Sequence, residues 1–204
     1  MKDTSSAVLD CLSAVDVDGS AADVGSGWGR IVDHLRDLGW SVQGCELDPE
    51  KAAKAGVDHA DVRTWEPSGP VDLVSCIELI EHLPESDQVS LLHRLRSWMS
   101  AGGVLVISSP QRHSPVAWWD RLEARRAGRT YDWWDPTHIS VLRRRKLEGL
   151  LAETGFRVVS RVGVCFAPDA MAVRLVFCRR LRYASSGGSM WRFGWNVIYT
   201  CEAV

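Results

Sequence analysis

A glycine-rich turn between two apolar segments constrains the fold of this chain more than any other feature. Residues 21–30 read AADVGSGWGR, and Glu46 closes the apolar segment 40–45 that follows. The glycines permit positive φ angles and let a flat ligand lie against bare backbone. The helix that begins near Gly29 presents unpaired N–H groups to such a ligand. Because an acid at the end of the second strand can accept both hydroxyls of a ribose, turn and acid together predict a nucleoside site.

The spacing of the glycines distinguishes between two kinds of nucleoside site. A dinucleotide-binding turn has the pattern G-x-G-x-x-G, which opens a helix end to a pyrophosphate. Here the glycines run G-x-G-x-G, Arg30 stands where that pattern has Gly or Ala, and Asp23 precedes the turn. This arrangement resembles motif I of the class I S-adenosylmethionine (SAM)-dependent methyltransferases. The resemblance implies SAM as cofactor and S-adenosylhomocysteine (SAH) as product.

Further landmarks follow in the order that this family has them. Asp61 stands where the family commonly places an acid that hydrogen-bonds the adenine amino group. The apolar segment 71–77 runs into E-x-x-E-H. Two further segments that resemble family motifs are GGVLVISSP, which ends at residue 110, and LLAETGF, which ends at residue 156. The resemblance therefore covers roughly residues 20 to 165. The cofactor-binding residues that it implies are Gly25, Ser26, Gly27, Gly29, Glu46, Leu47, Asp61, Val62, Cys76 and Ile77.

The alternation of apolar strands and helices predicts one α/β domain spanning residues 1–204. We expect a Rossmann-like, doubly wound and mostly parallel sheet of seven strands, as in the class I methyltransferases. Ligands of such sheets bind at the carboxyl ends of the strands, where Gly25, Glu46, Asp61 and Ile77 would meet. Two inserts, at 113–137 after strand five and at 168–193 after strand six, are predicted to form the lid and substrate pocket.

The net charge of −2 conceals an asymmetry between the two halves of the chain. Residues 1–110 hold 8 basic and 18 acidic side chains, whereas residues 111–204 hold 16 basic and 8 acidic ones. Such a split indicates an anionic substrate, a nucleic-acid surface or a solvated basic face. The six cysteines form no C-x-x-C pair, which predicts free thiols in a reducing cytoplasm. No apolar run reaches the roughly twenty residues of a membrane helix.

Methyl transfer from a sulfonium is an in-line displacement that requires positioning, exclusion of water and sometimes a base. The N-P-P-Y and P-C signatures of DNA-base methyltransferases are absent. His138, before the helix of residues 143–154, is predicted to be a general base; the alternative is a histidine that holds the lid to the sheet. Tryptophan pairs in the first insert either line the acceptor pocket or fill its core. The predicted substrate residues are His113, Trp118, Trp119, Tyr131 and Trp134.

The E-x-x-E-H motif formed by Glu78, Glu81 and His82 has two interpretations. Together with His138 it resembles the metal-binding set of small-RNA terminal 2′-O-methyltransferases. Related spellings occur in ubiquinone-pathway O-methyltransferases and in many enzymes that methylate small molecules, where these residues shape the site without a metal. We favour the second interpretation, with Glu78 and His82 in the catalytic machinery beside His138 and no bound metal.

These observations predict a cytoplasmic SAM-dependent methyltransferase that acts on an oxygen or nitrogen of a small-molecule acceptor. The acceptor is expected to be aromatic or anionic, as in secondary metabolism. The alternatives are a metal-assisted RNA ribose 2′-O-methyltransferase and a SAM-binding module without turnover. We expect no nucleic-acid partner and no membrane partner, although residues 170–182 would suit a membrane surface if the acceptor were lipid-like. The sequence leaves the oligomeric state open.

Overall fold

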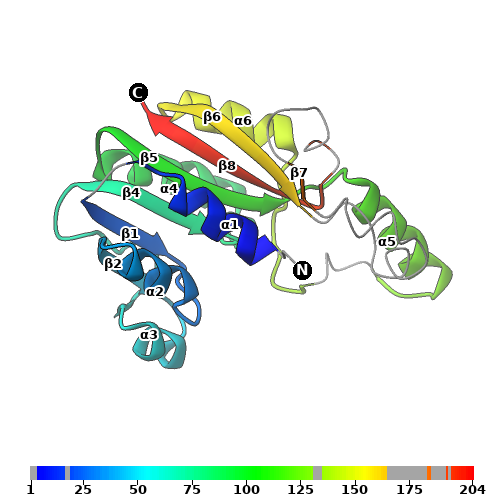
Figure 1. Cartoon of the computed structure of the whole chain (residues 1–204). Coiled ribbons are helices and arrows are strands. Elements are labelled where there is room, and N and C mark those ends of the chain that lie inside the picture. The colour runs from blue at the N-terminus through cyan, green and yellow to red at the C-terminus, as the bar shows by residue number, and fades with distance from the viewer. Residues whose placement is uncertain (1–3, 17–18, 131–134, 165–182, 185–191, 193) are drawn as a thin grey trace.

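A computed structural model describes residues 4–16, 19–130, 135–164, 183–184, 192 and 194–204 (Figure 1). Within these ranges eight strands form one sheet in the order β3-β2-β1-β4-β5-β8-β6-β7. The strands are β1 (Ser20–Val24), β2 (Ser41–Glu46), β3 (Asp58–His59), β4 (Val71–Ile77), β5 (Met99–Pro110), β6 (Phe156–Val164), β7 (Tyr183–Ala184) and β8 (Asn196–Ala203). The helices are α1 (Thr4–Ser13), α2 (Arg30–Asp37), α3 (Pro49–Ala55), α4 (Glu85–Trp98), α5 (Pro115–Arg126) and α6 (Arg144–Glu153), with a 3₁₀ turn, η1 (Ile80–His82).

The strand directions confirm the predicted doubly wound sheet. Strands β1 to β5 pair in parallel, and β8 runs antiparallel between β5 and β6. The two-residue β7 pairs with the end of β6 and extends the seven predicted strands by one. The glycine turn, Glu46, Asp61 and Ile77 all lie at or just beyond the carboxyl ends of β1 to β4. The edge at which such sheets bind ligands therefore carries the predicted cofactor residues.

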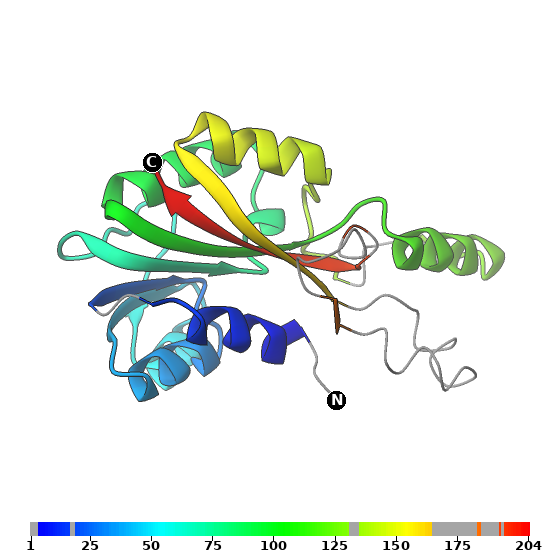
Figure 2. The same ribbon diagram turned by 45° about the horizontal axis from the view of Figure 1, so that its top comes forward.

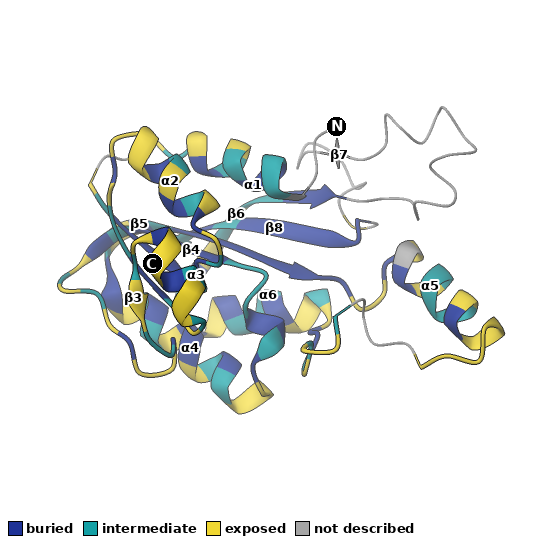
Figure 3. Ribbon diagram, turned by 90° about the horizontal axis from the view of Figure 1, so that it is seen from below, coloured by how far each residue is buried: buried dark blue, intermediate teal, exposed yellow. Residues whose placement is uncertain are grey.

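Helices cover both faces of the sheet. Helices α1, α2 and α3 lie on one face, and α4 and α6 lie on the other (Figure 2). Each face has its own buried core: Leu12 and Leu35 belong to one, and Leu91 and Leu151 to the other. Burial of each such side chain contributes about 1.5–3 kcal/mol of transfer free energy. The strands are mostly buried, while the outward faces of the helices are exposed (Figure 3).

Local signals in the sequence set the start of α2 and both ends of α3. Gly29 caps α2 with a φ of 84°, and a Cβ atom there would lie 2.8 Å from Cα of Ala55. Asp48 caps α3 by accepting two backbone N–H groups, and Gly56 ends the helix in the left-handed conformation. The close packing of α2 against α3 therefore requires glycine at position 29.

The first predicted insert contains α5, which extends beyond the carboxyl edge of the sheet (Figure 1). Pro115 lies in its first turn, and the hydroxyl of Ser114 caps it by accepting the N–H of Ala117. Of the second insert, residues 168–193, only β7 and Arg192 lie within the described residues. None of the described helices has the length and apolarity needed to span a bilayer.

Candidate active site

The glycine turn after β1 and Glu46 at the end of β2 form one hydrogen-bonded unit. Gly25, Gly27 and Gly29 have φ angles of 70°, 53° and 84°. The N–H of Gly27 donates to Oε2 of Glu46 at 2.8 Å, and the N–H of Asp48 donates to Oε1 at 3.0 Å. A carboxylate accepts about four hydrogen bonds, so lone pairs remain on both oxygens. The unit is therefore held in place and can still accept the hydroxyls of a ribose.

Two cavities border Gly25 at this edge, with volumes of about 320 and 310 Å³. A Cβ atom on Gly25 would lie 2.9 Å from Cδ1 of Leu79, whereas one on Gly27 would meet nothing within 4 Å. A larger cavity of about 450 Å³ lies between α1 and β6, away from the predicted site residues. The predicted residues that line the first cavity are Glu46, Leu47, Asp61 and Val62, and those that line the second are Ser26 and Ile77. The donor set and the space fit an adenosine on the Glu46 side and an amino acid on the Ser26 side.

Buried polar groups support the turn from beneath. Asp23 is 1% exposed and its Oδ1 accepts the hydroxyl of Ser75 at 2.5 Å. Burial raises the pKa of Asp23 to about 6, although hydrogen bonds from Ser75 and Ser26 oppose this shift. The hydroxyl of Ser26 donates to the carbonyl of Asp23 at 3.0 Å, and the thiol of Cys76 is completely buried. Ser26 and Cys76 therefore direct their polar atoms inward.

Asp61, the predicted adenine acceptor, lies beside an arginine that the motif analysis did not single out. The backbone N–H and the guanidinium of Arg63 donate to Asp61 at 2.9 and 3.0 Å. These hydrogen bonds lower the pKa of Asp61. Arg63 lines the first cavity as well. Asp61 is therefore an ionised acceptor at the wall of that cavity.

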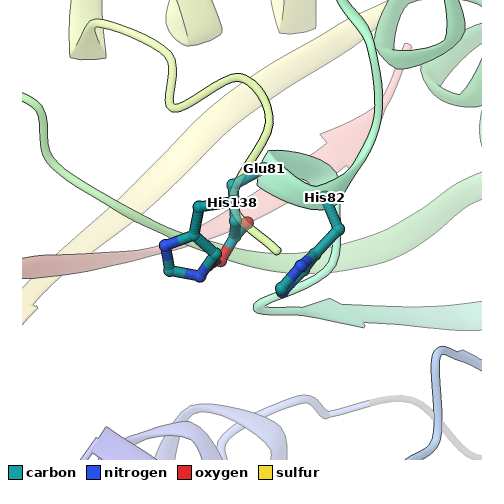
Figure 4. A group of neighbouring side chains, drawn as sticks. All are labelled: Glu81, His82 and His138. Carbon is teal, nitrogen blue, oxygen red and sulfur yellow. Dashed lines mark ion pairs between the residues drawn. The ribbon is translucent and has the colours of Figure 1, made fainter. Parts of the chain in front are cut away.

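A cluster of three side chains lies beside the first cavity: Glu81 and His82 of η1, and His138 from the segment before α6 (Figure 4). One nitrogen or oxygen from each residue lies within 4.8 Å of the others. Nε2 of His138 is 4.0 Å from Oε1 of Glu81, and the two imidazole rings are 4.8 Å apart. His82 also borders the first cavity. We call Glu81, His82 and His138 the catalytic cluster because two of them, His82 and His138, are predicted catalytic residues; the cluster adjoins the predicted cofactor site.

Comparison with known proteins agrees with this architecture. Residues 5–161 match the family described as methyltransferase domain. The chain belongs to this family. The ubiquinone biosynthesis O-methyltransferase of Colwellia psychrerythraea is 24% identical over 78% of this chain and 72% of its own length. The trans-aconitate 2-methyltransferase of an Azoarcus species is 35% identical over 34% of this chain and 30% of its own length.

The structural comparison shows the same fold. A SAM-dependent methyltransferase from Archaeoglobus fulgidus superposes with a TM-score of 0.70 at 16% identity, covering 96% of this chain and 91% of that one. The family match, the fold and the cofactor edge together make this chain a SAM-dependent methyltransferase that converts SAM to SAH.

The methyltransferase holds its catalytic cluster through backbone hydrogen bonds and one buried amide. The N–H groups of Ile139 and Ser140 both donate to the carbonyl of Glu81 at 3.0 Å. The side-chain nitrogen of Gln88 lies 2.8, 3.1 and 2.8 Å from the carbonyl oxygens of residues 80, 83 and 140. Gln88 is fully buried among the leucines of α4. A polar residue on an apolar helix face was the signal that could have identified it.

The hydrogen bonds of His82 determine which of its nitrogens carries the proton. Nδ1 lies 3.2 Å from the carbonyl of Thr137 and 2.9 Å from its hydroxyl, which donates to Asp135 at 2.5 Å. A carbonyl only accepts, so Nδ1 of His82 is protonated. In the neutral ring the lone pair therefore lies on Nε2.

Glu81 is the most constrained member of the cluster. The residue has no exposed surface, and neither carboxylate oxygen has a hydrogen-bond partner among the described residues. Burial, followed by the negative charge of Glu78, raises the pKa of Glu81 well above that of an ordinary carboxyl. A buried carboxylate requires a compensating proton or cation. A protonated His138 or a divalent metal held by all three residues would supply it.

Glu78 is not a member of the cluster, although the motif places it three residues from Glu81. Its φ of 50° is the left-handed conformation, which is uncommon for a residue with a side chain. Its Oε1 accepts the hydroxyl of Ser108 at 2.5 Å, and its Oε2 accepts the amide of Asn196 at 2.9 Å. Glu78 is therefore directed toward β5 and β8, and the structure assembles three of the four residues in the predicted E-x-x-E-H…H set.

The predicted acceptor residues are dispersed. His113 lies among arginines and borders neither cofactor cavity. Trp118 is 64% exposed on α5, and Trp119 is half-buried. Tyr131 and Trp134 lie outside the described residues. Their roles in acceptor binding remain predictions.

Proposed function

We propose that this methyltransferase transfers the methyl group of SAM to an oxygen or nitrogen of a small-molecule acceptor, with His138 as the general base. The observation that carries the proposal is the buried carboxylate of Glu81, 4.0 Å from Nε2 of His138 beside the cofactor cavity. A base assisted by a carboxylate suits removal of a hydroxyl proton. We therefore favour a hydroxyl oxygen as the acceptor atom.

The residues of the cofactor edge have separate tasks in this proposal. Glu46 and the glycine turn would hold the adenosine and its ribose, and Ser26 and Ile77 would border the amino-acid portion. Bound SAM supplies an electrophilic methyl group on a sulfonium. The protein positions the acceptor beside this methyl group and receives the proton of the acceptor. An in-line displacement requires no covalent intermediate with the protein.

The proton passes from the acceptor hydroxyl to His138 as the new oxygen–carbon bond forms and the bond between that methyl carbon and sulfur breaks, which leaves SAH. The resulting imidazolium lies beside Glu81, whose buried carboxylate is stabilised by a positive neighbour. Glu81 acts through His138 and is a positioning residue. His82 presents Nε2 as a hydrogen-bond acceptor and can orient a second polar group of the acceptor.

The two curated relatives guide the choice of acceptors for a test. One acts in ubiquinone biosynthesis as an O-methyltransferase and the other methylates trans-aconitate. We expect SAH to accumulate when the protein and SAM are incubated with some members of a panel of dihydroxybenzoates, dihydroxycinnamates and tricarboxylates. Chromatography of SAH and mass spectrometry of the product would locate the methyl group. Methylation confined to aromatic amines in the same panel would refute the preference for oxygen.

Glu81→Gln tests the positioning role of the carboxylate. The glutamine has nearly the same shape but cannot stabilise an imidazolium, so kcat falls and its dependence on pH changes while SAH affinity stays unchanged. An unaltered pH profile for kcat would mean that Glu81 has only a structural role.

A second function is favoured by the same cluster: metal-assisted methylation of a ribose hydroxyl in RNA. The three side chains form a candidate site for a divalent cation, and the oxygens of Glu81 lack hydrogen-bond partners among the described residues. Two imidazoles and a carboxylate match catalytic sites that keep an open position for substrate. This function predicts that a chelator abolishes activity on an oligoribonucleotide and that Mg²⁺ or Mn²⁺ restores it. Chelator-resistant activity on small hydroxylated acceptors would exclude it.

A further inference from the structure

A second polar cavity of about 290 Å³ lies outside the cofactor site. The described residues that line it are the three residues that follow β5, the cap and first residues of α6, and Arg192. We call it the arginine pocket. The start of α6 and the connection from β5 to α5 lie at the same end of the sheet (Figure 2). The lining residues are Gln111, Arg112, His113, Arg143, Arg144, Arg145 and Arg192.

The charge of the arginine pocket is positive throughout. Among the lining residues that the structure describes, five are arginines and none is acidic. The pKa of His113 responds to these positive charges. Desolvation lowers the pKa of its imidazole, and so do the charges of Arg143, Arg121 and Arg112. Cations that line a concave surface focus a positive potential into it. The pocket therefore favours an anion.

The start of α6 is unusual for a helix that only needs to fold. Its cap, Arg143, makes no side-chain capping bond, and its first turn has no acidic residue. Acidic side chains are the ones that stabilise this end of a helix, whereas positive charges there oppose the helix dipole. Arg144 and Lys146 have carboxylate partners, Glu148 at 4.0 Å and Glu85 at 2.5 Å. The concentration of positive charge at this end thus has a cost for folding that a bound anion would offset.

Two exposed arginines, Arg143 and Arg145, have no such partner. Within the described part of the chain neither forms an ion pair, although both line the pocket. Their guanidinium groups present donors in a fork that matches a carboxylate or a phosphate. These two arginines are the ones whose removal tests the pocket most directly.

The arginine pocket is close to the catalytic cluster along the chain. Arg143 follows His138 by five residues, which limits their Cα separation to about 18 Å. A group bound in the pocket can therefore belong to the same molecule as a hydroxyl that reaches His138, with a spacer of no more than roughly 20 Å.

We propose that the arginine pocket binds an anionic group, a carboxylate or a phosphate, of the acceptor whose hydroxyl is methylated beside His138. This assignment rests on the proposed function. RNA fits the pocket less well, because nucleic-acid-binding domains commonly have a pI above about 9 and this chain has a sequence pI near 6.3. The concave shape also suits a compact anion better than an extended backbone.

Calorimetry with two small anions tests the pocket without turnover. Inorganic phosphate and tricarballylate are titrated into the full chain at low ionic strength, and the stronger of the two identifies the type of anion. Arg143→Gln/Arg145→Gln is expected to weaken that binding at least tenfold. The control, Lys54→Gln/Arg157→Gln, removes the same charge from exposed sites outside the pocket and changes affinity less than twofold. No binding to the wild type, or equal weakening in both variants, overturns the proposal.

A matched pair of acceptors extends the test to catalysis. With 3,4-dihydroxycinnamate, Arg143→Gln/Arg145→Gln raises KM at least tenfold and leaves kcat nearly unchanged. With the methyl ester, which lacks the anion, the variant and the wild type have the same KM. An oligoribonucleotide that binds more tightly than either small anion, and loses affinity equally in both variants, would identify a nonspecific basic surface and overturn the proposal.

The two proposals fail in different ways. Methylation of uncharged acceptors by a protein that binds neither phosphate nor tricarballylate overturns the anion pocket and preserves the proposed function. Anion binding that Arg143→Gln/Arg145→Gln abolishes, without methyl transfer to any acceptor in the panel, preserves an anion site and overturns both the proposed function and the assignment to an acceptor.

Discussion

The two sides of the sheet edge differ in charge and in the way that their polar groups are held. On the cofactor side, at the carboxyl ends of β1 to β3, the side chains of Asp23, Glu46 and Asp61 are acidic and all accept hydrogen bonds. On the side where we propose that the acceptor binds, beyond β5 and before α6, the described residues that line the pocket include five arginines and no acid. Fixed carboxylates suit a cofactor with a sugar diol and positive groups. Exposed guanidiniums suit a ligand that brings its own negative charge.

The catalytic cluster lies where these two sides meet. Glu81 and His82 are carried by η1 at the end of β4, and His138 belongs to the segment that leads into α6. Gln88 and the carbonyl of Glu81 join the two parts through hydrogen bonds. This arrangement predicts that cofactor affinity, proton transfer and acceptor affinity respond to separate substitutions.

The largest effect is expected from His138→Ala. Removal of the general base should lower kcat by about 10²–10⁴-fold, because the acceptor proton then has no positioned recipient. SAH affinity measured by calorimetry should stay within twofold, since His138 does not line the cofactor cavities. The exposed His93→Ala on α4 is the matched control and should keep full activity. A small change in kcat would show that the base lies elsewhere in the site.

Asp23→Asn tests how the ionisation of a buried carboxyl on the cofactor side lowers the free energy of unfolding. The pKa of Asp23 is raised from 3.8 to about 6, so the folded protein holds this proton more tightly than the unfolded chain does. The stability from this group is complete below pH 4 and is lost as pH rises through 6, a loss of about 3 kcal/mol. The asparagine variant cannot titrate. Its free energy of unfolding without SAM, relative to wild type, should therefore rise by about that amount between pH 4 and 7.5; parallel curves would contradict this.

The cofactor side and the acceptor side also differ in how far the sequence predicted them. Local signals sufficed for the glycine turn, Glu46 and the alternation of strands and helices, because each depends on backbone conformation or on short-range periodicity. The E-x-x-E-H motif predicted neighbours along the chain but not directions in space. The left-handed φ of Glu78 and its partners Ser108 and Asn196, 30 and 118 residues away, are tertiary effects.

The acceptor side depended even more on tertiary contacts. His113 was predicted to bind the substrate together with aromatic residues of the first insert, and the structure places it beside arginines from two distant segments. The charge asymmetry of the sequence was consistent with an anionic substrate, a nucleic-acid surface or a solvated basic face, and it located none of them. Gln88 was overlooked because the partners of its side chain are not local to α4. They are the carbonyl groups of Ile80 in η1, of Leu83 that caps η1, and of Ser140, 52 residues away.

Gln88→Met tests the joint between the two sides. Methionine fills a similar volume but leaves three carbonyl oxygens without this donor, which should lower the free energy of unfolding by about 2 kcal/mol. The segment that carries His138 should also exchange its amide hydrogens faster, as hydrogen-exchange mass spectrometry would measure. Gln43→Met, which removes one hydrogen bond to Ser68, is the control and should cost less than half as much. Equal losses of unfolding free energy in the two variants would mean that Gln88 contributes no more to stability than a single ordinary hydrogen bond.

Glu46→Gln is expected to have the smallest effect of the four, and it isolates the cofactor side. The glutamine keeps one carbonyl oxygen as an acceptor, so part of the contact with Gly27 or with a ribose hydroxyl survives. Hydrogen bonds to a charged acceptor are stronger than those to a neutral one, and we therefore expect about a tenfold loss of SAH affinity, equivalent to about 1.4 kcal/mol. Glu50→Gln removes an exposed acid four residues away and should leave SAH affinity unchanged. In both variants phosphate binding to the arginine pocket should equal that of wild type. A loss of phosphate binding in Glu46→Gln would mean that the two sides are coupled and that cofactor affinity and anion affinity do not respond to separate substitutions.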